Sequence, residues 1–307
     1  NPGKTKRLDA RVKSGHDDVR KLRLPMTITV TPTGAALGAR VTGIDLSHDL
    51  SDESVEELRA IIHEHIVAVF PEQDFTARQQ LHFAEYLGPV ARRKLPDDYD
   101  IPPSSQEEPG IAYVSNVRME DGRVDGVIPD GEMWFHHDTC YKPEPDRFTM
   151  LYGIKIPSKG GNTMWANMYR AWETLPRELK TVLKGRKALN VYDYATIERP
   201  DLSDLDKVEH AWQPAMVTHP VTGRESLFVN RLMSCRLEGM DDTESLDVLN
   251  AVFDHAEQRD FVYEHVWSEG DFVIWDNLAC THARTHFDMG DIRRLRRSKV
   301  GGTRLVA

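Results

Sequence analysis

Two histidines and one aspartate, far apart in the sequence, are the side chains best suited to metal chemistry. His136 and Asp138 form a His-x-Asp triplet, and His282 follows far downstream. Two imidazoles and one carboxylate on one face of a metal ion leave coordination positions open, which is the ligand set of non-haem Fe(II) oxygenases. A cysteine-rich zinc site is closed and tetrahedral, and it does not suit oxygen chemistry.

The setting of the triplet matters because the sequence contains three of them, His16/Asp18, His136/Asp138 and His286/Asp288. The first lies in a charged segment without apolar periodicity, and the last precedes a turn-like Met-Gly-Asp. The middle triplet follows Trp134 and Phe135 and precedes an apolar run at 148–156. On a strand, its two ligands project to the same face, whereas His137 points to the other face and contacts outer structure.

The elements that must position these ligands are mainly strands. Apolar runs predict strands at 26–30, 66–70, 113–117 and 272–275. Helical periodicity predicts a helix capped by Ser51 and further helices at 76–87, 168–175, 177–183 and 242–257. Strands on both sides of a helical middle predict a mainly β double-sheet jelly roll with helices packed outside. The Pro- and acid-rich segment 91–132 predicts an active-site lid, with a surface insertion as the alternative.

Composition limits the class of protein. The 307 residues carry a net charge of −10, which argues against a nucleic-acid partner. We expect a charged N-terminal extension at 1–24, followed by one domain at 25–307. The three cysteines are an odd number without metal-type spacing, so we expect no disulfide framework and a cytoplasmic protein. We expect no membrane helix, no secretory signal, a small-molecule substrate and a homo-oligomer.

Four blocks of sequence together resemble the taurine dioxygenase/TfdA family. They are Trp134–Asp138, Pro157–Trp165, Trp275–His282 and Arg293–Arg297, and they occur in the family's order. The resemblance covers residue 26 to the C-terminus, and it implies a double-stranded β-helix that depends on Fe(II), 2-oxoglutarate and O2. It also implies that His136, Asp138 and His282 bind the iron. His286 is the less favoured alternative, because the family spacing from Trp275-Asp276-Asn277 selects His282.

The resemblance also implies a site for 2-oxoglutarate. The distal carboxylate needs a planar bidentate partner, which arginine supplies better than lysine. Alignment without gaps places this arginine at Arg297, with Arg293 four residues earlier, and Thr163 matches the family threonine that donates a hydroxyl hydrogen bond. Arg294 and Arg296 are competitors, but alternation along a strand puts them on the opposite face.

The substrate-facing residues follow less directly from the resemblance. Family members contact the substrate from the loop after the second helix and from the strand before His-x-Asp, where this sequence has Arg92, Arg93, Tyr113 and Asn116. A cation near the iron would suit a carboxylate, sulfonate or phosphonate, although the arginine pair equally fits a solvated surface. Lys299 replaces a common family threonine, and the segment after Lys94 lacks the sulfonate-binding histidine arrangement. Both departures argue against taurine.

The implied reaction oxidises a substrate C–H bond and converts 2-oxoglutarate to succinate and CO2. We favour a small organic acid of the aryloxyalkanoate kind, with sulfonates and related carboxylates in the same class. One alternative is an oxygenase of an amino acid or natural-product intermediate, and another is a catalytically silent metal-binding jelly-roll protein. Halogenation is disfavoured because halogenases replace the carboxylate ligand with a small residue, whereas Asp138 is present.

Overall fold

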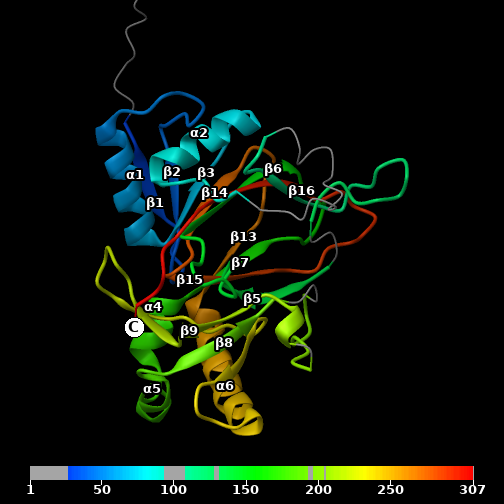
Figure 1. Cartoon of the computed structure of the whole chain (residues 1–307). Helices are drawn as coiled ribbons and strands as arrows, with labels where there is room; N and C mark the ends of the chain where they lie inside the picture. The colour runs from blue at the N-terminus through cyan, green and yellow to red at the C-terminus, as the bar shows by residue number, and fades with distance from the viewer. Residues whose placement is uncertain (1–26, 93–107, 128–130, 193–195, 204, 307) are drawn as a thin grey trace, which may run out of the picture.

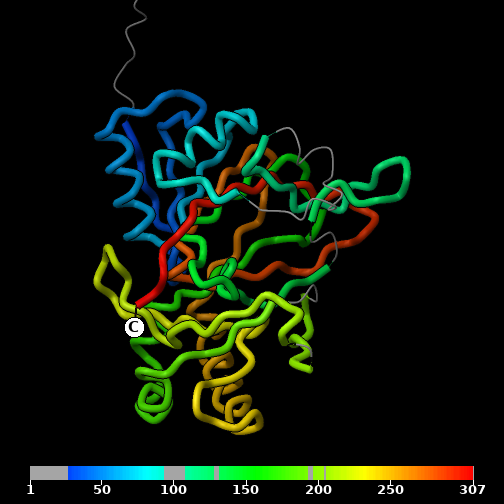
Figure 2. The backbone as a smooth tube through the Cα atoms, in the orientation of Figure 1, coloured from blue at the N-terminus to red at the C-terminus, as the bar shows by residue number. Residues whose placement is uncertain are grey.

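A seven-stranded sheet forms one layer of the molecule. The computed structural model describes residues 27–92, 108–127, 131–192, 196–203 and 205–306, so the extension expected at 1–24 lies outside the described residues. The strands, in spatial order, are β1 (Thr29–Pro32), β2 (Ala39–Thr42), β3 (Val67–Phe70), β14 (Phe272–Asp276), β6 (Phe148–Lys155), β16 (Arg294–Val300) and β4 (Ala112–Ser115). Neighbouring strands are antiparallel except β2 and β3, which are parallel. Strand β16, in the red C-terminal part of the chain, lies beside β6, in the green middle part (Figure 2).

A second sheet faces the first across an apolar core. It has four strands in the order β13 (Val262–His265), β7 (Thr163–Asn167), β15 (Cys280–Arg284) and β5 (Met133–His136). Trp165 of this sheet packs with Trp275 and Leu295 of the larger one, and all three are fully buried. Figure 1 shows the two layers one above the other. The mainly β, double-stranded β-helix expected from the sequence is therefore confirmed.

Two helices cover the outer face of the larger sheet (Figure 1). They are α1 (Asp52–His65) and α2 (Ala77–Leu87), and their apolar faces join a core that includes Phe70 and Phe272. The Ser51 hydroxyl caps α1, and Thr76 with Gln79 forms a capping box at α2. These caps satisfy backbone N–H groups that the first helical turn leaves without partners.

The middle of the chain lies below the smaller sheet in Figure 1 and contains a second apolar cluster. Its elements are α4 (Met168–Thr174), α5 (Arg177–Leu183), β8 (Lys187–Val191), η1 (Leu205–Lys207), β9 (His210–Pro214), β10 (Met216–Thr218), β11 (Glu225–Leu227), β12 (Ser234–Leu237), α6 (Asp242–Ala256) and η2 (Arg259–Phe261). Strands β12, β8 and β9 form one small sheet, and β10 and β11 form another. The sequence pattern predicted α4, α5 and α6 but neither the two 3-10 helices nor the two small sheets.

The segment 91–132 is only partly a loop. Strand β4 lies within it, close to the strand expected at 113–117, and pairs with β16. Residues 93–107 and 128–130 lie outside the described residues, so the lid stays a prediction. Cys140, Cys235 and Cys280 are free thiols. Within the described ranges, no helix is long and apolar enough to cross a membrane.

Candidate active site

The structure brings together the three side chains that the sequence pattern selected as metal ligands. His136 is the last residue of β5, and it is the register partner of His282 on β15. Their ring centroids lie 4.0 Å apart, and His282 Nε2 is 3.9 Å from Asp138 Oδ2. One ligand atom from each residue falls within 4.8 Å of the others. His286 lies beyond the end of β15 with an exposed side chain, so the favoured histidine is the one at the site.

The chemistry of this donor set fits a divalent iron. The Nδ1 atom of His136 lies 2.9 Å from the Trp134 carbonyl oxygen, which can only accept, so the Nδ1 position carries the proton and Nε2 is left as the ligand atom. Burial lowers the pKa of His136 and of His282, so burial favours the neutral, metal-binding form of both imidazoles. Burial alone would raise the pKa of Asp138, but His282, Lys299 and Arg297 together hold it below its usual range.

Asp138 differs from the sequence-based expectation in one respect. Strand β5 ends at His136, and Asp138 lies in the turn that follows. The Thr149 hydroxyl on β6 donates to Asp138 Oδ2 over 2.6 Å, so a tertiary hydrogen bond, rather than strand alternation, aims the carboxylate. His137 points away from the site as expected, because its ring packs on Phe228 with centroids 4.3 Å apart. Burial lowers the pKa of His137 to about 3.

A cavity next to the three ligands contains the residues expected to bind 2-oxoglutarate. Its lining comprises Val114, Met133, His136, Asp138, Leu151, Thr163, Trp275, His282, Ala283, Arg284, Arg293 and Arg297. Arg296 lies on the other face of β16, where its Nε donates to Gln80 Oε1 over 2.7 Å. Arg294 pairs with Asp125. The face assignment along the last strand therefore separates Arg297 from both competitors.

Two of the three arginines that line the cavity, Arg297 and Arg293, differ in their surroundings. Arg297 Nε is buried and finds no hydrogen-bond partner within the part of the chain that the structure describes. Burial has the largest effect on the pKa of each metal ligand, and the charge of Arg297 is close enough to lower all three pKa values. Arg293 Nε instead donates to the Gly161 carbonyl over 2.9 Å, two residues before Thr163. Arg297 is therefore the cation beside the metal ligands, whereas Arg293 is held at Gly161.

The structure does not bring the expected substrate residues to this cavity. On β4 the side chain that lines the cavity is Val114, and the neighbouring Tyr113 ring lies 4.6 Å from the Arg294 guanidinium instead. Asn116 holds the backbone before β16, because its Oδ1 accepts from the Arg293 N–H over 2.9 Å. Arg92 is exposed to solvent, and Arg93 lies outside the described residues.

Four residues around the site had not been selected from the sequence. Arg284 lines the cavity two residues after His282, so strand alternation was a usable signal for it. Trp267 donates its indole N–H to Thr163 Oγ1 over 3.0 Å. Thr149 on β6 and Asn277 in the turn after β14 contact Asp138 from distant parts of the chain. No local pattern reveals these three contacts, because each depends on which strands become neighbours.

The fold and the ligand set define a class: a double-stranded β-helix whose open metal face carries two histidines and one carboxylate. The chain belongs to the family described as "Taurine catabolism dioxygenase TauD, TfdA family", which matches residues 29–299. It is a 2-oxoglutarate-dependent non-haem iron dioxygenase, and Fe(II), 2-oxoglutarate and O2 are its cofactor and co-substrates.

Individual relatives agree with this assignment. The chain is 32% identical over 288 residues to alpha-ketoglutarate-dependent 2,4-dichlorophenoxyacetate dioxygenase from Cupriavidus pinatubonensis, covering 89% of this chain and 97% of the relative. It is 31% identical to pentalenolactone F synthase from Streptomyces avermitilis, with 89% and 93% covered. The crystal structure of AAD-2 in complex with Mn(II) and N-oxalylglycine superimposes with a TM-score of 0.74 at 26% identity, covering 92% of this chain and all (100%) of that one.

Proposed function

We propose that the enzyme oxidises a C–H bond of a small carboxylic acid of the aryloxyalkanoate kind. The observation that carries this proposal is the buried Arg297 Nε without a partner among the described residues, beside the metal ligands. A buried guanidinium is stabilised when a carboxylate accepts its N–H groups in a bidentate pair. A substrate held there by its carboxylate would present its neighbouring carbon to the metal face.

His136, Asp138 and His282 are the residues that would hold the iron, because the Nε2-ligand tautomer and the neutral imidazoles fit a divalent cation. When bound, the iron and 2-oxoglutarate supply the oxidant, and the co-substrate leaves as succinate and CO2. The cavity walls around them are apolar at Val114, Leu151 and Trp275, so they exclude water from the reacting carbon.

We assign the distal carboxylate of 2-oxoglutarate to Arg293 and Thr163, which both line the cavity; Arg293 is hydrogen-bonded to Gly161, two residues before Thr163. Two methylene groups separate this carboxylate from the keto-acid end, so its partner must lie away from the metal. The ungapped alignment had assigned this carboxylate to Arg297 first and to Arg293 second, so the present assignment exchanges the two arginines. Trp267 supports the assignment, because a hydroxyl that accepts an indole N–H keeps its own proton free to donate into the cavity.

The product chemistry suits an ether-linked acid. Hydroxylation of a carbon between a carboxylate and an ether oxygen gives a hemiacetal, which breaks into an alcohol or phenol and a 2-oxo acid. A second candidate, oxidation of a natural-product intermediate, is supported by the 31% identity to pentalenolactone F synthase.

We also propose a cytoplasmic location and a homo-oligomer. Light scattering on the purified enzyme tests the assembly.

A substrate panel tests the proposal. Purified enzyme with Fe(II) and 2-oxoglutarate is mixed with aryloxyalkanoates, sulfonates, phosphonates and terpenoid lactones, and succinate is measured. We expect succinate formation above the substrate-free rate with the aryloxyalkanoates, and loss of this stimulation when the carboxylate is esterified. Stimulation only by sulfonates, or equal stimulation by the esters, would contradict the proposed substrate class.

A further inference from the structure

The Asn277 side chain holds the backbone of the proposed metal ligand Asp138 at two points. Its Oδ1 accepts from the Asp138 N–H over 2.8 Å, and its Nδ2 donates to the Asp138 carbonyl over 2.8 Å. The same Nδ2 donates to the Asp146 carbonyl over 2.9 Å, so one fully buried amide ties both ends of the segment 138–146. The Asp146 N–H also donates to Thr139 Oγ1 over 2.8 Å, which closes the segment on itself.

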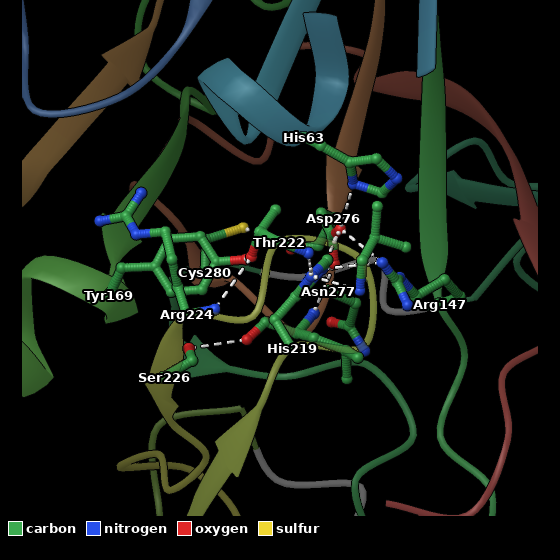
Figure 3. Close-up of polar contacts among 12 residues, drawn as sticks. His63, Arg147, Tyr169, His219, Thr222, Arg224, Ser226, Asp276, Asn277 and Cys280 are labelled. Carbon is green, nitrogen blue, oxygen red and sulfur yellow. Dashed lines mark hydrogen bonds and ion pairs between the residues drawn. The ribbon is translucent and has the colours of Figure 1, made fainter. Parts of the chain in front are cut away.

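Asn277 is in turn held by an ionic cluster around its neighbour Asp276 (Figure 3). Asp276 Oδ2 lies 2.8 Å from His219 Nε2, 3.2 Å from His63 Nδ1 and 3.2 Å from Arg147 Nη2. These three partners come from the loop after β10, from α1 and from the residue before β6. The Asn277 N–H donates to the Arg147 carbonyl over 2.9 Å, so the cluster and Asn277 share one partner. The turn between β14 and β15 is thereby joined to three separate parts of the fold.

This cluster has the composition of a second metal site, because His63, His219 and Asp276 place ligand atoms within 4.8 Å of one another. Two contacts argue against a metal there. The Thr222 N–H donates to His219 Nδ1 over 3.0 Å, so the ring proton resides on Nε2 and points at Asp276. Arg147 Nη2 lies 2.7 Å from the same Nε2, so a permanent cation already occupies the position that an ion would take. The cluster is therefore structural.

We propose that Asn277 is a positioning residue for the metal carboxylate, and that the Asp276 cluster keeps Asn277 in place. Asp138 lies in a turn after β5, where no strand pairing fixes its backbone. Asn277 fixes that backbone, and Thr149 binds Oδ2, the carboxylate oxygen that lies 3.9 Å from His282 Nε2, so the carboxylate is already oriented beside the other ligands. Partners behind a metal ligand that lock its orientation typically raise metal affinity about 10–100-fold.

The test measures Co(II) affinity, which reports on the ligands without turnover. The variants are Asn277→Ala and Asn190→Ala. Asn190 is also a fully buried asparagine, but its hydrogen bonds go to Ser234 and Ala188. We expect both variants to lower Tm, since each loses buried hydrogen bonds. Only Asn277→Ala should weaken Co(II) binding, by about 10–100-fold. Wild-type Co(II) affinity in Asn277→Ala, or equal weakening in Asn190→Ala, would overturn the proposal.

The proposal rests on Asp138 as a metal ligand, so Asp138→Ala is measured alongside. If Asp138→Ala binds Co(II) like the wild type, the metal site itself is wrong. If Asp138→Ala loses Co(II) binding and Asn277→Ala keeps it, only the positioning role is wrong. Should Asn277→Ala not fold, Asn277→Ser retains one short polar group and is measured in the same way, with near-UV circular dichroism as the check on folding.

Discussion

His282 lies directly opposite His136 in the antiparallel pair of β15 and β5, with ring centroids 4.0 Å apart. Side chains on directly opposed residues of an antiparallel pair project to the same face of the sheet. The register of two strands therefore brings two imidazoles from distant parts of the chain to one metal. A shift of one residue would send the side chain of His282 to the opposite face.

We expect His282→Ala to abolish both turnover and metal binding, and His286→Ala to leave both near the wild-type level. The reason is that only His282 reaches the other ligands, whereas His286 is exposed beyond the strand. Metal content after reconstitution and succinate formation measure the two effects. The reverse ranking of the two variants would show that the wrong histidine had been assigned.

Arg293→Lys should raise the 2-oxoglutarate KM without changing metal affinity. Arg297→Lys should instead raise the KM of the primary substrate. In both variants a lysine ammonium replaces a planar guanidinium, which can donate two parallel hydrogen bonds to a carboxylate. Losing one charge-assisted hydrogen bond costs about 1.5–3 kcal/mol, or roughly 10- to 150-fold in affinity. Kinetics with each substrate varied in turn give the two constants. If Arg297→Lys raises the 2-oxoglutarate KM and Arg293→Lys does not, the two roles are exchanged.

Trp267→Phe should weaken 2-oxoglutarate binding modestly while leaving metal affinity unchanged. It removes the N–H that orients the Thr163 hydroxyl, and a neutral hydrogen bond contributes about 0.5–1.5 kcal/mol. Trp165→Phe is the matched control, because Trp165 is fully buried and its Nε1 has no partner among the described residues. Competition with N-oxalylglycine measures the 2-oxoglutarate affinity of each variant. Equal weakening in the two variants would point to a packing effect.

Sequence patterns predicted the features that depend on local order. Ser51 was recognisable as a helix cap because capping involves residues only three positions apart. The face of β16 that carries Arg297 followed from strand alternation. The metal ligands followed from residue type, their apolar setting and the resemblance to a family. The capping and alternation signals can be seen within a few neighbouring residues, whereas the resemblance depends on four separate blocks of sequence.

The rest depends on tertiary contacts that local patterns do not encode. Thr149 and Asn277 reach Asp138 only because β6 and the turn after β14 become its neighbours. Tyr113 was selected for the substrate, but the alternation on β4 turns Val114 toward the cavity instead. The position of β4 along the chain was predictable, whereas the face that β4 presents to the site was not.

Metal binding should release less than one proton per site at pH 6.5. Ligand histidines must be deprotonated to bind a metal, and burial lowers the pKa of both His136 and His282 below the ordinary value of 6.5. Two unshifted histidines would each be half protonated at that pH and would release about one proton in total. Calorimetric Co(II) titrations in two buffers of different ionisation enthalpy measure this number. Release of one proton or more would mean that the imidazoles are not held neutral in the folded apoprotein.

The most direct test of the account compares wild type and Asp138→Ala for succinate formation from 2-oxoglutarate, with and without Fe(II) and under anaerobic conditions. Asp138 is the single carboxylate of the proposed ligand set, and its removal opens the site. We predict succinate formation by the wild type that requires both Fe(II) and O2, and none above background from Asp138→Ala. Iron-dependent succinate formation by Asp138→Ala at the wild-type rate would contradict the account.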